Sequence, residues 1–370
     1  MRIGIIGAGQ LGQMLGTAAQ DLGFECRFID PSDSPPAGST GAVIRKAFDD
    51  PDALAQLAAD CDVVTYEFEN VPVEALHAIA DVVPVYPPPS ALAIAQDRLH
   101  EKRLFDELDI PLPGYRVIDS RQDMQAAAAD LGLPMVIKTR RFGYDGKGQV
   151  VIRDLQQIDA VWDQLGKQPL VAEAWVAFDY EVSIIGVRNA QGAVAIWPLT
   201  QNKHVDGILH SSRSPVENHG LFERASAYMN RMLSHLDYVG VLALELFVCN
   251  DALLANEFAP RVHNSGHWTI EGADTSQFTN HLLAISGQSP ASTACSGHAG
   301  MLNLVGEIPA AARQFEDERI SLHDYDKTPR PGRKLGHITV LAASAAERDD
   351  LLQTVAEIVT GSTPAGGHSA

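Results

Sequence analysis

The stretch PMVIKTRRFGYDGKGQVVI, residues 134–152, decides how the rest of the chain is interpreted. Two apolar runs, 135–137 and 150–152, flank a loop with three glycines and four cations, which predicts two strands joined by a hairpin loop. The glycines let the backbone approach a ligand closely and the cations attract an anion, so we expect a polyphosphate here. The Walker A motif is absent, and a basic surface hairpin is the alternative. The loop residues concerned are Lys138, Arg140, Arg141, Gly143, Gly146, Lys147 and Gly148.

The composition is that of an ordinary folded, acidic protein. The 370 residues carry a formal net charge of -19, which argues against nonspecific binding to nucleic acid or anionic membranes. This length predicts roughly two to three domains. The four cysteines lie far apart and form no metal or disulfide motif, so we expect reduced thiols in the cytoplasm. No run reaches the roughly 18 apolar residues of a membrane helix, and the N-terminal MRIGIIGAG is too short for a signal peptide.

The N-terminal residues predict a strand, a glycine turn and a helix. An apolar run at 2–6 leads into GAGQLG at 7–12, and apolar residues then recur at helical spacing. A second strand at 25–29 ends in Asp30, which formally completes the G-x-G-x-x-G fingerprint of dinucleotide-binding proteins. The same amides at a helix N-terminus serve any phosphate, and a purely structural turn is a further alternative, so NAD is only one interpretation.

Alternating strands and helices then complete a doubly wound, Rossmann-like α/β domain. Glu69 and Asn70 follow its fourth strand, where open α/β sheets bind ligands, so they are candidates for substrate contacts or for the cap of the next helix. The run PPPS at 87–90 marks the expected domain boundary. The remaining elements expected here are strands at 42–45, 62–66 and 82–86 and helices at 51–59 and after Pro72.

The middle of the chain predicts a second region that mixes helices and strands. The expected helices lie at 96–108, 121–131, 155–165 and 221–236, and the expected strands at 115–118, 170–176, 181–187 and 193–197. Before the last of these helices, the polar residues Lys203, His204, Asp206 and His210 predict a connector.

Two apolar strands between residues 239 and 258 are expected to pair through a turn at Asn250 and Asp251, and each carries one glutamate. Burying a carboxylate costs several kcal/mol unless it is paired or binds a cation. Glu245 and Glu257, with Asn256 beside the second, therefore form an oxygen-ligand set suited to Mg²⁺ held together with phosphates. Two glutamates on the solvent face of an edge hairpin are the alternative.

Two later segments hold candidate anion ligands. In PRVHNSGHW at 260–268, the two histidines stand four residues apart, but the residues between them are poor helix formers, so a pocket for a small anion is favoured over zinc. RPGRK at 330–334 predicts a second phosphate site, with an exposed basic turn as the alternative. The C-terminal elements expected are strands at 301–305 and 334–341, a helix at 344–358 and a disordered tail at 363–370.

Taken together, these motifs resemble those of ATP-grasp enzymes. More narrowly, the chain resembles the N5-carboxyaminoimidazole ribonucleotide synthetase family of purine biosynthesis over essentially its whole length. The strings that carry the likeness are GAGQLGQML, YEFENVP, QDR, KTRRFGYDGKGQ, NEFAPRVHNSGHW and RPGRKLGHI. The resemblance implies an ATP-grasp fold, α/β and α+β, with a Rossmann-like domain at 1–89, a nucleotide-binding domain at 90–288 and a small C-terminal domain at 289–370. Phe142 is a departure, because many relatives are expected to have glycine there.

The resemblance also implies a reaction and a division of labour. The expected activity is ATP-dependent carboxylation of 5-aminoimidazole ribonucleotide by bicarbonate through carboxyphosphate, with ATP and Mg²⁺ as cofactors and a homodimer as the assembly. The implied ATP contacts are Arg98, Lys138, Gly143, Tyr144, Asp145, Gly146, Lys147, Gly148, Gln149, Glu173, Ala174, Trp175, Val176, Glu181, His204, Asn256 and Glu257. The implied metal ligands are Glu245 and Glu257. The implied contacts to the ribonucleotide and bicarbonate are Gln10, Leu11, Glu69, Asn70, Tyr144, Asp145, Arg261, His263, Asn264, Ser265, Gly266, Lys327, Arg333 and Lys334. The implied catalytic residues are Asp145, Arg261, His263, Lys327 and Arg333.

Three other functions remain open from the sequence. Another ATP-grasp ligase, joining a carboxylate to an amine or formylating a purine precursor, would keep the nucleotide residues without the RPGRK cluster. A dehydrogenase would use only the glycine turn, and a nucleotide sensor would bind without catalysis. In the favoured reaction, Asp145 or the departing phosphate accepts the amine proton, and the loop at 140–148 closes as a lid.

Overall fold

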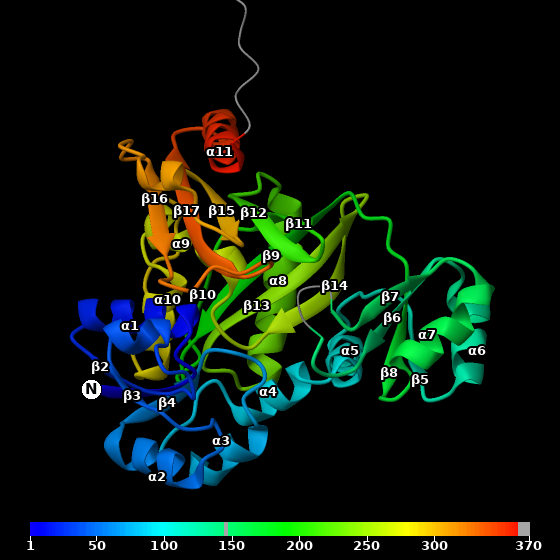
Figure 1. Ribbon diagram of the computed structural model, residues 1–370, viewed down its shortest axis with the longest axis horizontal. Coiled ribbons are helices and arrows are strands. Elements are labelled where there is room, and N and C mark those ends of the chain that lie inside the picture. Colours follow the sequence, from blue (N-terminus) through cyan, green and yellow to red (C-terminus); the bar gives the residue numbers. More distant parts are fainter. Residues whose placement is uncertain (144–146, 362–370) are drawn as a thin grey trace, which may run out of the picture.

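The computed structural model describes residues 1–143 and 147–361, and these residues form three β-sheets (Figure 1). A four-stranded parallel sheet begins the chain, a four-stranded antiparallel sheet follows it, and a nine-stranded antiparallel sheet takes up the middle and C-terminal parts. Figure 1 shows the second sheet, in cyan and green, set apart from the blue N-terminal sheet. The predicted combination of α/β and α+β structure is therefore confirmed.

The first sheet has the strand order β3-β2-β1-β4, as expected for a doubly wound domain. The strand predicted at 82–86 is wrong, because only an isolated bridge joins Val85 to Val64. Pro84 and Pro87 flank this bridge and lack the N–H groups that a longer ladder needs. The elements of this part are β1 (Arg2–Ile6), α1 (Gln10–Asp21), β2 (Glu25–Ile29), η1 (Pro36–Ser39), β3 (Ala42–Ile44), α2 (Pro51–Asp60), β4 (Val63–Tyr66) and α3 (Val73–Ala80).

The second sheet contains the hairpin predicted from residues 134–152. Its strands β6 and β7 pair antiparallel, with Lys138 opposite Gln149 at the loop end. Phe142 has a φ of 61°, a left-handed conformation that favours glycine, and this explains why glycine is expected at its position. The elements are β5 (Tyr115–Ile118), α6 (Arg121–Leu131), β6 (Met135–Thr139), β7 (Gln149–Ile152), η2 (Leu155–Gln157), α7 (Ile158–Leu165) and β8 (Leu170–Ala174).

The third sheet corrects two predictions. The predicted connector is wrong, because residues 200–214 form the hairpin β11–β12, whose many polar side chains conceal alternating burial. A further strand, β16, was not predicted. The strands are β9 (Tyr180–Arg188), β10 (Val194–Ile196), β11 (Thr200–Val205), β12 (Ile208–Ser214), β13 (Gly240–Cys249), β14 (Ala252–Ala259), β15 (His298–Val305), β16 (Ile320–Asp324) and β17 (Lys334–Ala342). The accompanying helices are α8 (His219–His235), η3 (Asn264–Gly266), α9 (Thr269–Gly272), α10 (Gln277–Ile285), η4 (Ala310–Arg313) and α11 (Ala345–Thr360).

Packing between these parts fixes the positions of two helix N-termini. Helix α1 packs on α10, and Leu11 and Leu15 of α1 share one buried core with Phe278 of α10, so the glycine turn lies beside the large sheet. The proline run at 87–90 leads into helix α4 (Pro89–Ala95) rather than a loop, and α5 (Arg98–Glu107) follows it. The predicted helix at 96–108 begins at Arg98, because the Asp97 side chain accepts a hydrogen bond from the Leu99 amide.

Two further predictions concern the chain as a whole. The tail predicted at 363–370 lies outside the described residues. Within residues 1–143 and 147–361, none of the helices combines the length and apolarity that crossing a bilayer requires.

Candidate active site

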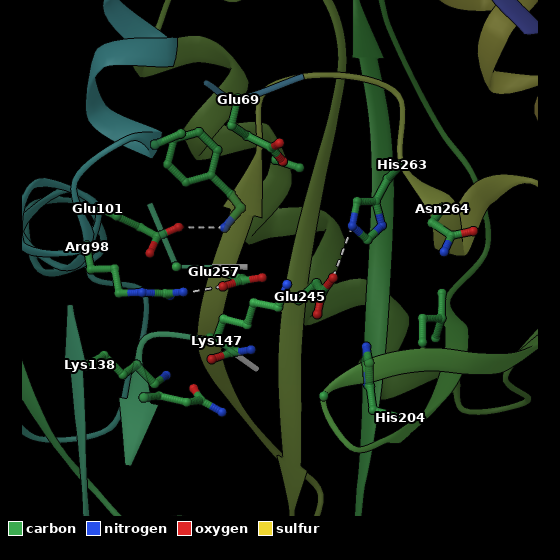
Figure 2. Close-up of a pocket in the computed structure, with 18 of the residues that line it drawn as sticks. Glu69, Arg98, Glu101, Lys138, Lys147, His204, Glu245, Glu257, His263 and Asn264 are labelled. Atoms are coloured by element: carbon green, nitrogen blue, oxygen red, sulfur yellow. Dashed lines mark hydrogen bonds and ion pairs between the residues drawn. The ribbon is translucent and has the colours of Figure 1, made fainter. Parts of the chain in front are cut away.

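A cavity of about 670 Å³ lies where the three sheets meet, and segments of all three line it. Figure 2 shows its polar side chains around the hairpin β13–β14. Arg98 and Lys138 lie on one side of the carboxylates of Glu245 and Glu257, and His263 lies on the other. The cations Arg98 and Lys138 thus lie on one side of the carboxylate pair and an imidazole lies on the other, an arrangement that suits an anionic ligand and a cation bound together.

Glu245 and Glu257 stand directly opposite each other in the register of β13 and β14, with a β-bulge after Glu245. Two like charges at such a site repel each other unless a cation lies between or beside them. Arg98 donates to Glu257 at 3.0 Å, and His263 pairs with Glu245 at 3.1 Å. Burial opposes ionisation of Glu245, but the hydrogen bond from His263 and the charge of His204 lower the pKa of Glu245 overall.

The donor set fits Mg²⁺. Two carboxylates and the neighbouring amide oxygen of Asn256 all line the cavity, and oxygen is the ligand atom that Mg²⁺ prefers. The solvent-face alternative is not supported for Glu245, whose side chain is 13% exposed.

The buried carboxylate of Glu173 pairs with two lysines near the Arg98 side of the cavity. It forms ion pairs with Lys138 at 2.9 Å and with Lys102 at 3.0 Å, and Glu173 is only 3% exposed. Burial would raise the pKa of Glu173, but Lys138 and Lys102 lower it to about 2. Glu173, one of the implied ATP contacts, thus also orients Lys138.

Two stacked phenylalanine rings and a His–Glu pair also line the cavity. Phe178 stacks on Phe247 with ring centroids 4.8 Å apart, and both rings line the cavity. His204 Nδ1 lies 2.6 Å from a carboxylate oxygen of Glu181. Burial lowers the pKa of His204, but the hydrogen bond with Glu181 and the charge of Glu245 outweigh it and raise that pKa.

Arg261 and Asn264 belong to the polar lining of the same cavity. Arg261 is held by an ion pair with Glu69. Both amide atoms of Asn264 and the Nε of Arg261 are buried, and these atoms have no hydrogen-bond partner among the described residues. Because buried polar atoms are normally paired, they indicate a ligand. His263 Nδ1 meets the Ser265 hydroxyl at 2.8 Å, which fixes the imidazole that faces Glu245.

The C-terminal cations meet the glycine turn of the N-terminal part. Lys327 Nζ donates to the side-chain oxygen of Gln10 at 2.6 Å, and Lys334 lines the cavity beside it. Burial, Arg333 and Lys334 lower the pKa of Lys327 to about 8, and the opposing charge of Glu67 offsets them only in part. Arg333 itself donates to the Thr328 carbonyl at 3.1 Å and does not line the cavity.

The acidic residue of the dinucleotide fingerprint is already engaged. Asp30 accepts hydrogen bonds from the amides of Ala8 at 3.0 Å and Ser32 at 2.8 Å and is 7% exposed. Because a ribose hydroxyl needs an accessible carboxylate, the burial of Asp30 and the use of both its oxygens argue against the NAD interpretation.

Most of the predicted residues converge on this cavity. Those that line it are Gln10, Leu11, Glu69, Asn70, Arg98, Lys138, Gly143, Lys147, Gln149, Trp175, Glu181, His204, Glu245, Asn256, Glu257, Arg261, His263, Asn264 and Lys334. Those placed elsewhere are Gly148, Glu173, Ala174, Val176, Ser265, Gly266, Lys327 and Arg333. Those outside the described residues are Tyr144, Asp145 and Gly146.

Sequence reasoning missed several residues of the cavity. Glu101 is buried and accepts a hydrogen bond from the Phe258 amide at 2.7 Å (Figure 2). Burial and the charge of Glu257 raise the pKa of Glu101 to about 8. Its position three residues after Arg98, on one face of α5, is a signal that could have found it. The aromatic wall carried no comparable signal, whereas His267, which also lines the cavity, belongs to the histidine pair noted at residues 260–268.

The fold and the site define an ATP-grasp ligase, with a glycine-rich hairpin on one sheet facing paired carboxylates on another. Residues 103–278 match the family model of the ATP-grasp domain. Residues 1–96 match the ribonucleotide synthetase preATP-grasp domain, and residues 299–350 match the phosphoribosylaminoimidazole carboxylase C-terminal domain.

Individual relatives narrow this class. The N5-carboxyaminoimidazole ribonucleotide synthase of Pseudomonas aeruginosa is 46% identical over 358 residues, which cover 97% of this chain and 98% of the relative. The crystal structure of the Thermus thermophilus synthetase has a TM-score of 0.93 at 45% identity, with 97% and 98% coverage. The Aspergillus clavatus synthase, in complex with ADP and 5-aminoimidazole ribonucleotide, has a TM-score of 0.90 at 29% identity, with 97% and 98% coverage. The chain belongs to the N5-carboxyaminoimidazole ribonucleotide synthase family, which confirms the resemblance seen in its sequence.

Proposed function

We propose that the cavity uses ATP to carboxylate 5-aminoimidazole ribonucleotide with bicarbonate, giving N5-carboxyaminoimidazole ribonucleotide, ADP and phosphate. The observation that carries this proposal is the meeting of two separate cation groups at one carboxylate pair. Arg98 and Lys138 serve a nucleotide, whereas Arg261 and Lys334 serve a second and a third anion. Three anionic reactants need such separate positions, and the family membership supports their identity.

The nucleotide occupies the side formed by the small sheet and the edge of the large one. Lys138 and Arg98 neutralise its phosphates, and the stacked rings of Phe178 and Phe247 offer an apolar wall to its base. Glu181 accepts hydrogen bonds from ribose hydroxyls. Glu245 and Glu257 would hold Mg²⁺ with Asn256, and the bound ion would neutralise charge that spreads over the transferred phosphoryl group.

Bicarbonate occupies the polar pocket beside that phosphoryl group. Arg261 and the unpaired amide of Asn264 hold the anion so that one of its oxygens attacks the γ-phosphorus in line. The bond from the γ-phosphorus to the bridging oxygen breaks, ADP leaves, and carboxyphosphate forms. His263, held by Ser265 and paired with Glu245, keeps the pocket polar and fixed in shape.

The ribonucleotide occupies the side next to the glycine turn. Lys327 and Lys334 bind its phosphate near Gln10, which points its exocyclic amine toward the bicarbonate pocket. Carboxyphosphate splits into CO₂ and phosphate, and the amine nitrogen forms a bond to the CO₂ carbon. The departing phosphate or Asp145 accepts the amine proton, as the sequence predicts.

The direct test measures ADP release from Mg·ATP with and without bicarbonate and 5-aminoimidazole ribonucleotide, while labelled bicarbonate is trapped on the ribonucleotide. The expected result is ADP formation that needs both substrates and acid-labile label on the amine. ATP consumption without fixed carbon would show that the acceptor is a different molecule, and the assignment of the nucleotide site would stand. ATP left untouched under all conditions would contradict the proposed function.

Three further expectations belong to this proposal. The enzyme acts in the cytoplasm, in keeping with four free cysteines and the acidic composition. It forms a homodimer, which size-exclusion chromatography with light scattering tests. It consists of three domains, residues 1–89, 90–288 and 289–370.

A further inference from the structure

Glu67 follows strand β4, and its side chain turns into the glycine turn at 7–12. Its two carboxylate oxygens accept hydrogen bonds from the amides of Gly9 at 2.6 Å and Gly12 at 2.5 Å. The residue is 8% exposed. In dinucleotide-binding turns, the amides at this helix N-terminus contact the pyrophosphate of the ligand. In this chain, a carboxylate of the protein itself holds that anion position.

The glycines of the turn are shaped around this carboxylate. A Cβ atom on Gly7 would lie 2.4 Å from Glu67 Cγ, and one on Gly9 would lie 2.7 Å from Glu67 Oε1. A Cβ atom on Gly12 would lie 3.3 Å from Glu67 Oε2. Gly7 and Gly9 therefore leave room for the Glu67 side chain, whereas a Cβ atom on Gly12 would first meet the Gly7 carbonyl oxygen at 3.0 Å.

Groups around the turn shift the pKa of Glu67 in both directions, and the net effect raises it. Burial raises the pKa of Glu67, the two amide hydrogen bonds lower it, and the nearby charge of Asp30 raises it further. Asp30 occupies the Ala8 amide, so two acidic side chains together take up three amides of the turn. Lys327 is the cation whose charge favours the ionised form of Glu67. Gln10 and Leu11 remain as residues of the turn that line the cavity.

We propose that Glu67 is a specificity-determining residue that fills the anion position of the glycine turn. It excludes a pyrophosphate group from the turn and leaves the Gln10–Leu11 end of helix α1 to a phosphomonoester. This inference rests on the proposed function, in which the phosphomonoester is the phosphate of the ribonucleotide. The glycine motif predicts dinucleotide binding, but here it serves a mononucleotide. The reason is that the buried Glu67 side chain already accepts hydrogen bonds from two amides of the turn.

The experiment titrates the full-length protein with inorganic pyrophosphate by calorimetry, with Mg·ADP present at saturation to fill the nucleotide side. Glu67→Ala removes the carboxylate and its volume, and we expect at least about a tenfold gain in pyrophosphate affinity over the wild type, because amide N–H groups become available. Glu67→Gln keeps the volume and is expected to stay within about threefold of the wild type. Equal affinity of Glu67→Ala and wild type would overturn the inference.

Asp33→Ala is the matched control, because it removes a carboxylate that is 94% exposed and leaves the turn closed. If it gains as much affinity as Glu67→Ala, net charge explains the result and the inference fails. Should Glu67→Ala fail to fold by circular dichroism, Glu67→Ser opens the same position and is judged by the same titration. A gain by Glu67→Ala in a protein without carboxylation activity would overturn the proposed function while keeping the anion exclusion by Glu67. Normal wild-type carboxylation with no such gain would overturn this inference alone.

Discussion

At the scale of single residues, the two carboxylates of the hairpin β13–β14 differ in their neighbours. Glu245 is held by His263, whereas Glu257 is held by Arg98, a residue of the nucleotide side. Each carboxylate of the proposed metal site thus pairs with a different part of the cavity lining.

Glu257→Gln keeps the shape of the side chain but removes its charge, so Mg²⁺ loses one anionic ligand. We expect the turnover number for ADP release to fall by about 100-fold or more. Steady-state assays over a range of Mg²⁺ concentrations provide the measurement, and Glu25→Gln on strand β2, where the side chain is 75% exposed, is the control. Near-normal turnover of Glu257→Gln would show that the metal assignment is wrong.

Lys327→Ala is expected to act on the ribonucleotide alone. Loss of a charge-assisted hydrogen bond should raise the KM for the ribonucleotide roughly 10- to 100-fold, with a smaller change in kcat. Since the pKa of Lys327 is about 8, its ammonium loses its proton above that pH, so the wild-type KM should rise between about pH 7 and 9. The KM of the variant should stay flat across that range; a parallel rise in both proteins would assign the effect to another group.

At the scale of elements, the turn and the β-bulge of the same hairpin together set the register of the carboxylate pair. Asn250 has a φ of 46° and Asp251 a φ of 62°, the left-handed pair of a tight hairpin turn. The turn sets a register in which Cys249 faces Ala252 and Leu246 faces Ala255, and the β-bulge between Glu245 and Leu246 then shifts the pairing by one residue, so that Glu245 faces Glu257 instead of Asn256.

Asp251→Val places a β-branched residue in a left-handed conformation and is expected to lower the free energy of unfolding by about 1–2 kcal/mol. Asp251→Gly, which tolerates this conformation, is the matched control and should change stability by less than about 0.5 kcal/mol. Both variants remove the same side-chain contact with Asn218, so their difference reports backbone strain. Urea unfolding measures it, and equal stability of the two would contradict the turn argument.

At the scale of the whole molecule, the cavity exists only where separate sheets meet. Lys138 belongs to the small sheet, Glu257 to the large one, and Gln10 to the helix after the first strand of the chain. A ligand in this cavity therefore contacts segments that lie far apart in the sequence and belong to different sheets. Ligand binding is expected to stabilise the entire chain by mass action.

Mg·ATP at about 100 times its dissociation constant should stabilise the native protein by about 2.7 kcal/mol, seen as a higher melting temperature in calorimetry. Chelation of Mg²⁺ should remove most of this gain, because the triphosphate then meets Glu245 and Glu257 without a counterion. NAD at the same concentration is the control. Equal stabilisation by NAD would favour the dinucleotide interpretation of the glycine turn.

The sequence by itself determined the local structure and the chemical types of the site. The hairpin at 134–152, the paired glutamates and the turn at Asn250 and Asp251 were all predictable, because periodicity, turn residues and buried charge leave signals within a few neighbouring residues. The family likeness was equally available, since long motifs in a fixed order carry it.

Only the tertiary structure decided which of these groups meet and which already have a hydrogen-bond or ion-pair partner within the protein. The sequence did not predict strands β11 and β12, because polar side chains conceal their alternating burial. Glu173 on β8 forms an ion pair with Lys138 on the neighbouring strand β6. Glu67 fills the glycine turn from a position 55 residues further along the chain than Gly12. Contacts between residues so distant in sequence depend on how the sheets pack, and no local pattern records that packing.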